Sequence, residues 1–435
     1  VLGAPGTGKT FQLIKSLEYL LKSKKADPRK ILVFSFNRKW AKIIRDKTAE
    51  TIRESFFEIP VTTFFAFCFE LIEKTSIDKK APVLVTAPVQ WKLLTDLLYS
   101  GIDKKKYPIS KKFLESSKFV ARSFTQEVFD FILRSQESLI KPGELLNKLY
   151  GYSEPIINEL AGIYLHYVNM LNYKGLYNYG RLLMDGLEII LNKSFKKNIL
   201  KSFDIIIVDE LQELNKAQYE ITKEISSESK CIYFGNDDEC IYAFRGSLID
   251  NFSKVYNLLS GTSFYEDNSK EKKHLSNYFK NIVSLEYNYR NSQSINNLAN
   301  DFISLNDARI KKYAKPAENT YLKNSLYNDE TIVIKEFRNS LEEINFICEQ
   351  IKKLVEIKKI RAENICIIAN SNSYKTRVLE NILLQNKIAF LKRSSRTILD
   401  NKYVKYTLDF VRLIALIKER EFGKNLNEIN NLLYV

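Results

Sequence analysis

The chain begins with VLGAPGTGKT, which matches the phosphate-loop pattern G-x-x-x-x-G-K-[ST]. Gly3, Gly6 and Gly8 carry no Cβ, so backbone N–H groups can turn around a phosphate at these positions. Lys9 supplies a positive charge for the β and γ oxygens of a nucleotide, and Thr10 offers a hydroxyl ligand for Mg²⁺. The opening residues therefore predict a site for a nucleoside triphosphate and Mg²⁺.

A helix is expected directly after this loop, over residues 11–21. Its apolar residues recur at helical spacing: Leu13, Ile14, Leu17, Leu20 and Leu21. The positive end of the helix dipole would face the bound phosphates, and Phe11 is counted among the nucleotide-binding residues. A glycine-rich turn that matches by chance is the alternative; the helix and a second, acidic motif argue against it.

That acidic motif follows an apolar run, residues 203–208, and consists of Asp209 and Glu210. A buried parallel strand has this pattern, and its polar residues emerge at the C-terminal edge of the sheet, where ligands bind. Asp209 is expected to hold Mg²⁺ through its water shell, and Glu210 to orient and deprotonate an attacking water. A capped strand end followed by a helix is the alternative.

Several segments resemble the motifs of superfamily 1 DNA helicases of the UvrD/Rep/PcrA group. Residues 209–219 resemble D-E-x-Q-D-x-x-x-x-Q, residues 235–246 resemble G-D-x-x-Q-x-I-Y-x-F-R-G, and residues 285–291 resemble L-x-x-N-Y-R-S. Residues 31–39 and 63–67 match T-F-T-N-K and T-F-H-S-F more loosely. The order agrees throughout. The resemblance is strong over residues 1–300 and weak over 330–420, and it extends to the AddA and AdnB motors.

This resemblance implies an ATP-driven motor that moves 3′→5′ on single-stranded DNA and acts at duplex junctions, with a nuclease or repair protein as a possible partner. Its cofactors would be ATP and Mg²⁺. Tyr289 would stack on the adenine, and Arg290 would reach the γ-phosphate and neutralise charge during phosphoryl transfer. The implied catalytic set is Lys9, Asp209, Glu210 and Arg290.

The same motifs imply a DNA-binding face. Its stacking residues would be Phe36, Tyr242 and Phe244, and its phosphate- or base-holding residues Asn37, Thr63 and Arg245. Each stacked base contributes about 1–3 kcal/mol. A ring buried in the core is the alternative for every aromatic residue; it is the favoured interpretation for Phe64 and Phe67, whereas DNA contact is favoured for Phe244.

Three positions depart from the motifs. Glu239 stands where the family has the glutamine that senses the γ-phosphate, Asn236 replaces an aspartate, and Phe65 replaces a histidine. A carboxylate repels a phosphate unless it is protonated or bridged by Mg²⁺. We therefore hypothesise that Glu239 slows hydrolysis without abolishing nucleotide binding.

The expected fold is α/β: a RecA-like P-loop domain with a parallel sheet and a helical insertion, followed by the start of a second RecA-like domain. The first domain would comprise residues 1–75 and 199–305, because Lys9 and Asp209 lie 209 − 9 = 200 residues apart. The insertion, residues 76–198, has amphipathic helical patterns over 119–135 and 156–171. Its lysine runs are interpreted as solvated surface, with duplex contact as the alternative.

The partial second domain would comprise residues 306–435. Strands are expected over 331–336, 365–369 and 388–391, with helices over 340–355 and 374–384 between them. The family's last two motifs, V-H-x-x-K-G-L-E and R-R-L-x-Y-V-x-x-T-R-A, do not occur before Val435, and Arg393 and Arg396 could replace the missing arginine only by default. We expect a piece of a longer protein, trimmed at both ends, in which processive unwinding needs further sequence.

Composition is compatible with this interpretation. The chain has 435 residues and a formal net charge of +15, which suits a polyanionic partner but could equally reflect biased coding composition. The five cysteines show no metal-site spacing, and no membrane span or secretory signal is visible, so we expect a reduced cytoplasmic interior. A nucleotide-gated DNA-binding subunit with little turnover, in a repair or defence complex, is the alternative function. RNA is not excluded as a substrate.

Overall fold

The computed structural model describes the chain from residue 1 to residue 414, with gaps. The residues left outside this description are 24, 52–58, 77–80, 104, 149–153, 193, 196–198, 200, 243–246, 248, 261–281, 308, 318–331, 370–373, 393–402, 405, 409, 412–413 and 415–435. The chain divides into two units, Val1–Ile332 and Val333–Val435, and each is described by itself.

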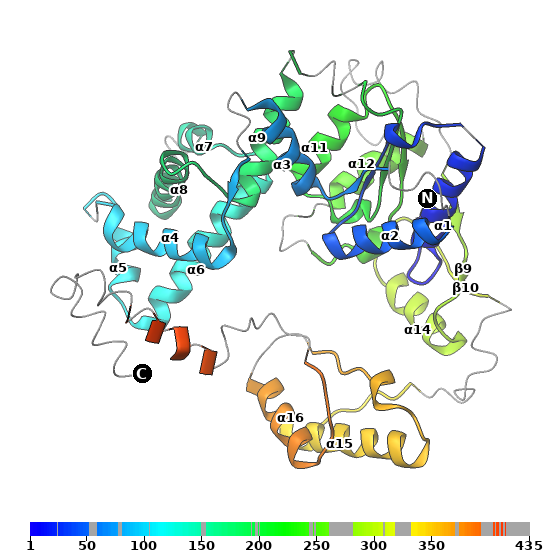
Figure 1. Ribbon diagram of the computed structural model, residues 1–435. Coiled ribbons are helices and arrows are strands. Elements are labelled where there is room, and N and C mark those ends of the chain that lie inside the picture. Colours follow the sequence, from blue (N-terminus) through cyan, green and yellow to red (C-terminus); the bar gives the residue numbers. More distant parts are fainter. Residues whose placement is uncertain are drawn as a thin grey trace. The chain divides into compact units, whose positions relative to one another are not determined.

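A parallel sheet forms the centre of the first unit (Figure 1). Four of its strands run in the order β3-β2-β6-β7; their bounds are Val61–Thr62, Ile31–Phe34, Ile205–Val208 and Lys230–Tyr233. Beyond β7 the sheet is continued by β1 (Leu2–Gly3), through a parallel bridge between Leu2 and Gly235, and β1 pairs in parallel with β8 (Ser284–Leu285). All the strands therefore end at the same edge.

Helices cover both faces of this sheet. On one face α1 (Lys9–Lys22) and α2 (Arg38–Thr51) pack on the strands, and on the other lie α3 (Phe64–Thr75), α9 (Tyr179–Leu191), α11 (Lys216–Ile225) and α12 (Ile249–Ser260). Every residue of β2 and β6 is buried, as expected of strands covered on both sides. The predicted helix over 11–21 and the strand after Phe203 are confirmed.

A second group of helices lies between β3 and β6 in the sequence. It contains α4 (Ala87–Asp96), α5 (Pro108–Leu114), α6 (Lys118–Glu137), α7 (Pro142–Lys148) and α8 (Pro155–Tyr173). These helices have their own core, in which Val128, Ile163 and Leu171 are fully buried. The helices predicted over 119–135 and 156–171 are thus confirmed. None of the described helices combines the length and the apolar character needed to cross a lipid bilayer.

Two strand pairs complete the first unit. The strands β4 (Val83–Leu84) and β5 (Leu176–Tyr177) pair with each other among these helices. Downstream of β8, the strand β9 (Tyr287–Asn288) pairs with β10 (Lys315–Pro316), and α14 (Gln293–Ser304) lies between them in the sequence. The domain limits proposed from the sequence stay predictions; α9, placed there in the insertion, buries Leu182, Leu183 and Leu187 in the core of the sheet.

The second unit contains α15 (Ser340–Lys352), which continues into a π-helical turn, Lys353–Ile357, and α16 (Tyr374–Gln385). Both predicted helices are confirmed, and Ile344, Cys348 and Leu383 form their core. The three predicted strands are wrong for the described residues, because 332–336, 365–369 and 388–391 form no ladder. Ile334 and Ile368, which would be buried in strands covered on both faces, stay 89% and 91% exposed.

Candidate nucleotide site and nucleic-acid face

The phosphate loop joins β1 to α1. Gly6 and Gly8 have φ angles of 80° and 88°, the left-handed region in which glycine carries no steric cost. Thr7 closes the loop, because its Oγ1 donates to the Ala4 oxygen at 2.7 Å. Gly8 is the N-cap of α1 and provides no side-chain cap. The first N–H groups of the helix are therefore left for an external acceptor such as a phosphate.

Lys9 lies at the start of α1 with its side chain buried. Its Nζ donates to the Gly3 oxygen at 2.9 Å and to Glu239 Oε2 at 2.7 Å. The side chains of Lys9 and Glu239 are 9% and 31% exposed, so the ion pair is only partly screened by water. The residue predicted to meet the γ-phosphate is thus paired with an acidic side chain.

Asp209 and Glu210 follow β6 at the edge where β2 and β7 also end. Asp209 is 3% exposed, and among the described residues its Oδ1 has no hydrogen-bond partner. The pKa of Asp209 is raised to about 7, mainly by burial; the charges of Glu210 and Glu239 also act to raise it, whereas a backbone hydrogen bond from Glu210 and the charge of Lys9 act to lower it. Lys9, Glu210 and Glu239 therefore all lie close enough to Asp209 to affect its protonation.

Glu210 has a left-handed backbone, with φ 54° and ψ 52°. One oxygen of its carboxylate accepts a hydrogen bond from Gln212 Nε2 at 2.7 Å. The other end of the same amide, Gln212 Oε1, accepts from the backbone N–H of Asn236 at 3.0 Å. Gln212 thus joins the expected catalytic base to the turn that carries Glu239.

Asn288 connects the phosphate loop to the segment of Tyr289 and Arg290. Its Nδ2 donates to the Pro5 oxygen at 3.1 Å, and its Oδ1 accepts from the backbone N–H of Arg290 at 2.9 Å. The backbone N–H of Tyr289 donates to the Gly6 oxygen at 2.9 Å. A Cβ added at Gly6 would lie 2.5 Å from Asn288 Oδ1 and 3.0 Å from Arg290 Cβ. Tyr289 and Arg290 therefore lie against the loop, with exposed side chains.

Sequence reasoning missed Asn288, although the asparagine of the N-Y-R segment was the available signal. It also missed a group of charged residues around the turn at Asp237–Glu239. Arg309 donates to both oxygens of Asp238, at 2.8 and 2.7 Å, and Lys312 pairs with Asp237 and Asp238. These four side chains are between 6% and 11% exposed, so the turn is held by a buried ion-pair cluster.

The predicted nucleic-acid residues are brought together only in part. The rings of Phe36 and Tyr242 stack, with centroids 5.4 Å apart and planes at 28°. Asn37 follows Phe36 in the sequence, and its Oδ1 accepts from the Trp40 N–H at 2.9 Å at the start of α2. Phe244 and Arg245 lie outside the described residues.

Thr63 lies between β3 and α3, at the edge of the sheet. It is 5% exposed and caps α3, because the Ala66 N–H donates to its Oγ1 at 3.3 Å. Phe64 follows it in the core and stacks on Phe34 at 4.1 Å, as favoured from the sequence; Phe67 meets Phe34 edge-on at 5.4 Å. The structure thus gives Thr63 a capping role, and a DNA contact by Thr63 stays a prediction.

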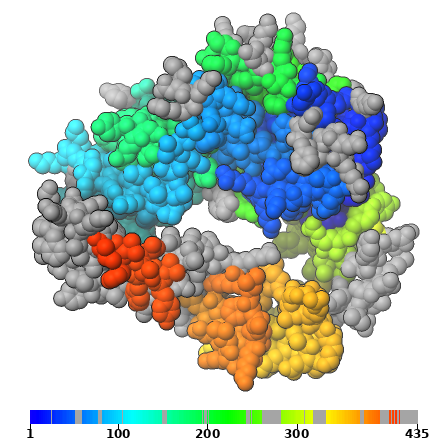
Figure 2. Space-filling model, in the orientation of Figure 1, coloured from blue at the N-terminus to red at the C-terminus, as the bar shows by residue number. Residues whose placement is uncertain are grey.

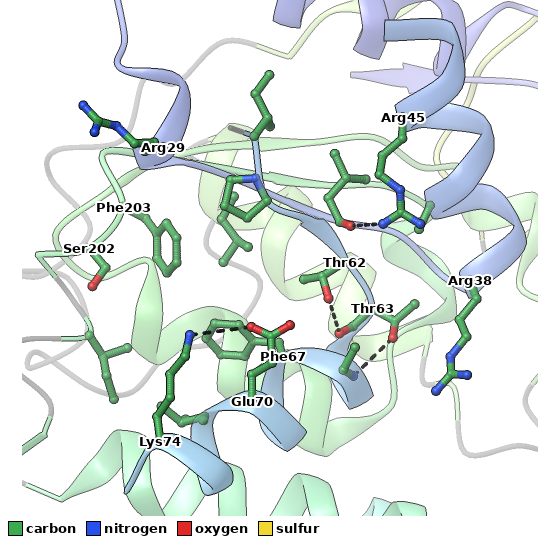
Figure 3. A pocket seen from close by; sticks show the side chains of 18 of the residues that line it. Arg29, Arg38, Arg45, Thr62, Thr63, Phe67, Glu70, Lys74, Ser202 and Phe203 are labelled. Carbon is green, nitrogen blue, oxygen red and sulfur yellow. Dashed lines mark hydrogen bonds and ion pairs between the residues drawn. The ribbon is translucent and has the colours of Figure 1, made fainter. Parts of the chain in front are cut away.

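A cavity of about 920 Å³ lies beside Thr63, at the β3 edge of the sheet (Figure 3). Its wall includes Arg38, Arg45 and Lys74, which come from α2 and α3. Arg45 donates to the Val61 oxygen at 2.8 Å, and Lys74 pairs with Glu70 at 3.7 Å. Basic side chains of α2 and α3 therefore line this cavity beside Thr63.

The donor set fits a magnesium–nucleotide. Asp209 offers a buried carboxylate oxygen that has no partner among the described residues, and an oxygen ligand is what Mg²⁺ prefers. Thr10 lies in the first turn of α1, directly after Lys9. The loop between Gly3 and Gly8 and the uncapped helix start provide N–H groups for phosphates.

Comparisons with known proteins agree with this geometry. The model of the UvrD/REP helicase N-terminal domain matches residues 1–260, and that of the UvrD-like helicase C-terminal domain matches residues 283–426. DNA helicase II of Escherichia coli (strain K12) is 24% identical over 425 residues, covering 95% of this chain and 52% of that protein. The ATP-dependent DNA helicase PcrA of Bacillus subtilis (strain 168) is 24% identical over 424 residues, covering 95% and 51%.

The chain thus spans about half the length of the curated relatives it matches. The first family model alone covers more than half of the chain, and it includes both the phosphate loop and the acidic pair. The chain therefore belongs to the UvrD/REP helicase family.

Proposed function

We propose that this chain is the nucleotide-binding part of an ATP-dependent motor that moves 3′→5′ along single-stranded DNA. The observation that carries the proposal is that Lys9, Asp209, Glu210 and Glu239 lie close enough to interact electrostatically. They do so at the end of the sheet where the phosphate loop lies. The names of the relatives, DNA helicase II and PcrA, support DNA as the substrate and ATP as the fuel.

The residues of the phosphate loop and of the acidic pair have different roles in this proposal. Lys9 and the N–H groups at the start of α1 hold the phosphates, while Thr10 and Asp209 hold Mg²⁺. Bound Mg²⁺ supplies neutralisation of the charge that develops on the phosphate oxygens. Glu210, fixed by Gln212, takes the proton of the attacking water.

Tyr289 and Arg290 complete the nucleotide site from β9. Tyr289 stacks on the base, and its exposed ring beside the loop leaves it available for this contact. Arg290, two residues after the end of β9, would face the terminal phosphate, and its backbone N–H is held by the asparagine that is bonded to the loop. Because Asn288 holds both the loop and the Arg290 N–H, and Tyr289 bonds to the same loop through Gly6, base binding and charge neutralisation are linked.

Single-stranded DNA would pass over Phe36 and Tyr242, whose stacked rings present aromatic surface to bases. Arg38, in the adjacent cavity wall, would meet backbone phosphates and give a salt-dependent grip. We further propose that strand separation at duplex junctions requires more of the protein than this chain, since the related helicases are about twice as long.

The test is phosphate release by the purified chain, measured with and without single-stranded oligonucleotide. Stimulation by DNA that is lost in Lys9→Ala and Glu210→Gln supports the motor. Binding of both ligands without stimulated turnover supports the second candidate, a nucleotide-gated DNA-binding subunit, which the Lys9–Glu239 ion pair favours. Absence of nucleotide binding would overturn both.

A further inference from the structure

The ammonium group of Lys9, which is proposed to hold the phosphates of a nucleotide, is paired with a carboxylate. This ammonium group donates to Glu239 Oε2 at 2.7 Å and to the Gly3 oxygen at 2.9 Å. We propose that Glu239 is an affinity- and selectivity-determining residue: it competes with the γ-phosphate for Lys9 and so weakens the binding of a triphosphate relative to a diphosphate. This inference rests on the proposed function of the same site.

Hydrogen-bond chemistry distinguishes this glutamate from the glutamine of the family motif. A glutamine amide can accept from Lys9 with its oxygen and donate to a phosphate oxygen with its nitrogen. The Glu239 carboxylate is an acceptor only, so Lys9 cannot keep it as a partner without bringing two negative groups together. Binding of a γ-phosphate must therefore break or weaken the ion pair.

The backbone around Glu239 is fixed, which keeps the carboxylate near Lys9. Asn236 is the N-cap of the turn: its Oδ1 accepts from the Asp238 N–H at 3.3 Å, and its own N–H is held by Gln212 at 3.0 Å. The Glu239 N–H donates to the Asn236 oxygen at 3.1 Å. Retreat of the turn would break its bond to Gln212, so rotation of the Glu239 side chain is the less costly way to release Lys9.

The buried charges on the other side of the turn strengthen this constraint. Asp237 accepts from the Ile310 N–H at 2.7 Å, and Asp238 forms a two-point ion pair with Arg309. Paired, buried charges of this kind are costly to separate. Glu239 is therefore the one member of this acidic triplet whose carboxylate points to the nucleotide site, where it pairs with Lys9.

A diphosphate should be affected less than a triphosphate. It ends at the β-phosphate, so it lacks the terminal group that would compete most directly with Glu239. Replacing Glu239 with the isosteric glutamine keeps an acceptor for Lys9 and removes the like-charge repulsion. The substitution should therefore tighten triphosphate binding selectively.

The experiment is calorimetric titration of the full chain with the magnesium complexes of ADP and of AMP-PNP, an ATP analogue that is not hydrolysed. We expect Glu239→Gln to tighten AMP-PNP binding about tenfold, roughly the loss of one charge-assisted competitor, and to tighten ADP binding clearly less. Glu18→Gln is the matched control, because Glu18 also pairs with lysines of α1, Lys15 and Lys22, and the net charge changes equally.

Each result decides the inference. Equal AMP-PNP affinity in the parent and Glu239→Gln, or equal tightening of both nucleotides, overturns the selectivity role and leaves nucleotide binding intact. Equal tightening by Glu18→Gln would also overturn it, since the cause would be net charge. If none of the proteins binds either nucleotide, the proposed function fails together with the inference. Glu239→Ala is the second variant, with the same expected direction, and thermal unfolding verifies that each variant folds.

Discussion

The side-chain amide of Asn288 donates to the backbone oxygen of Pro5 at 3.1 Å, across 283 residues of sequence. Asn288 is 2% exposed and also donates to Asn296 Oδ1 at 3.0 Å. One buried side chain therefore fixes the phosphate loop, the β9 strand and α14 to one another. Its position makes it a candidate for affecting the nucleotide site without touching the nucleotide.

Substitution of Asn288 by aspartate should separate its two roles. Aspartate keeps the oxygen that accepts from the Arg290 N–H, but loses the donor to Pro5 and Asn296. We expect a loss of about 1–3 kcal/mol of unfolding free energy, because a buried acceptor is left unpaired, together with weaker nucleotide binding. Urea unfolding and nucleotide titration measure the two effects; unchanged nucleotide affinity would mean that the loop holds its shape without Asn288.

Replacement of Glu210 by glutamine should keep nucleotide binding and remove hydrolysis. The amide retains the size of the side chain and can still meet Gln212, but it cannot take a proton from water. We expect DNA-stimulated phosphate release to fall by a factor of about 10² or more. Single-turnover experiments measure the rate of hydrolysis, and a nucleotide titration verifies that binding is retained. A hydrolysis rate near that of the parent would exclude Glu210 as the base.

The ion-pair cluster behind the turn should make stability depend on acid pH. Burial alone would raise the pKa of Asp238, but hydrogen bonds from Arg309 and Lys312 outweigh it and hold the pKa below its ordinary value of 3.8. The stabilisation is therefore complete above about pH 4 and is lost as the pH falls through the lowered pKa of the folded state.

Asp238→Asn should accordingly be less stable than the parent at pH 7, and the gap should be smaller at pH 3. At neutral pH the substitution leaves Arg309 and Lys312 without a charged partner at Asp238, which costs about 3–5 kcal/mol in buried pairs. Urea unfolding at both pH values measures the difference. A gap of the same size at both would show that Asp238 acts by packing.

Single-stranded DNA binding should depend on the stacked pair of Phe36 and Tyr242. Alanine at either position should weaken binding by about 1–3 kcal/mol per lost base stack, with little dependence on sequence. Tyr173→Ala is the matched control, because Tyr173 is 92% exposed at the end of α8. Fluorescence anisotropy with a labelled oligonucleotide measures the affinities; equal losses in all three variants would point to a general surface effect.

Local sequence patterns predicted the parts of the site that lie next to a buried strand or helix. The phosphate loop, α1 and the end of β6 follow from glycines, helical spacing and an apolar run within a few residues of one another. The motif order also predicted Glu239 near the phosphates, but its ion pair with Lys9 spans 230 residues and depends on the sheet order.

Long-range contacts and strand pairing were beyond the same reasoning. The pairing of Arg309 and Lys312 with the turn joins residues about seventy positions apart, and nothing in a run such as ARIKKYAKP specifies a partner. In the second unit, apolar runs of strand length predict strands that the described residues do not form. A short apolar run shows only that burial is favourable, whereas a strand also needs a neighbour for its backbone hydrogen bonds.

The left-handed backbone of Glu210 means that the residue best suited to hydrolysis is not the residue best suited to stability at this position. A residue with a Cβ pays about 1–2 kcal/mol in that conformation, which glycine avoids. A Glu210→Gly chain should consequently melt at a higher temperature than Glu210→Ala, although both lack the base. The proposed general base thus occupies a position where glycine would cause the least backbone strain but could not accept a proton.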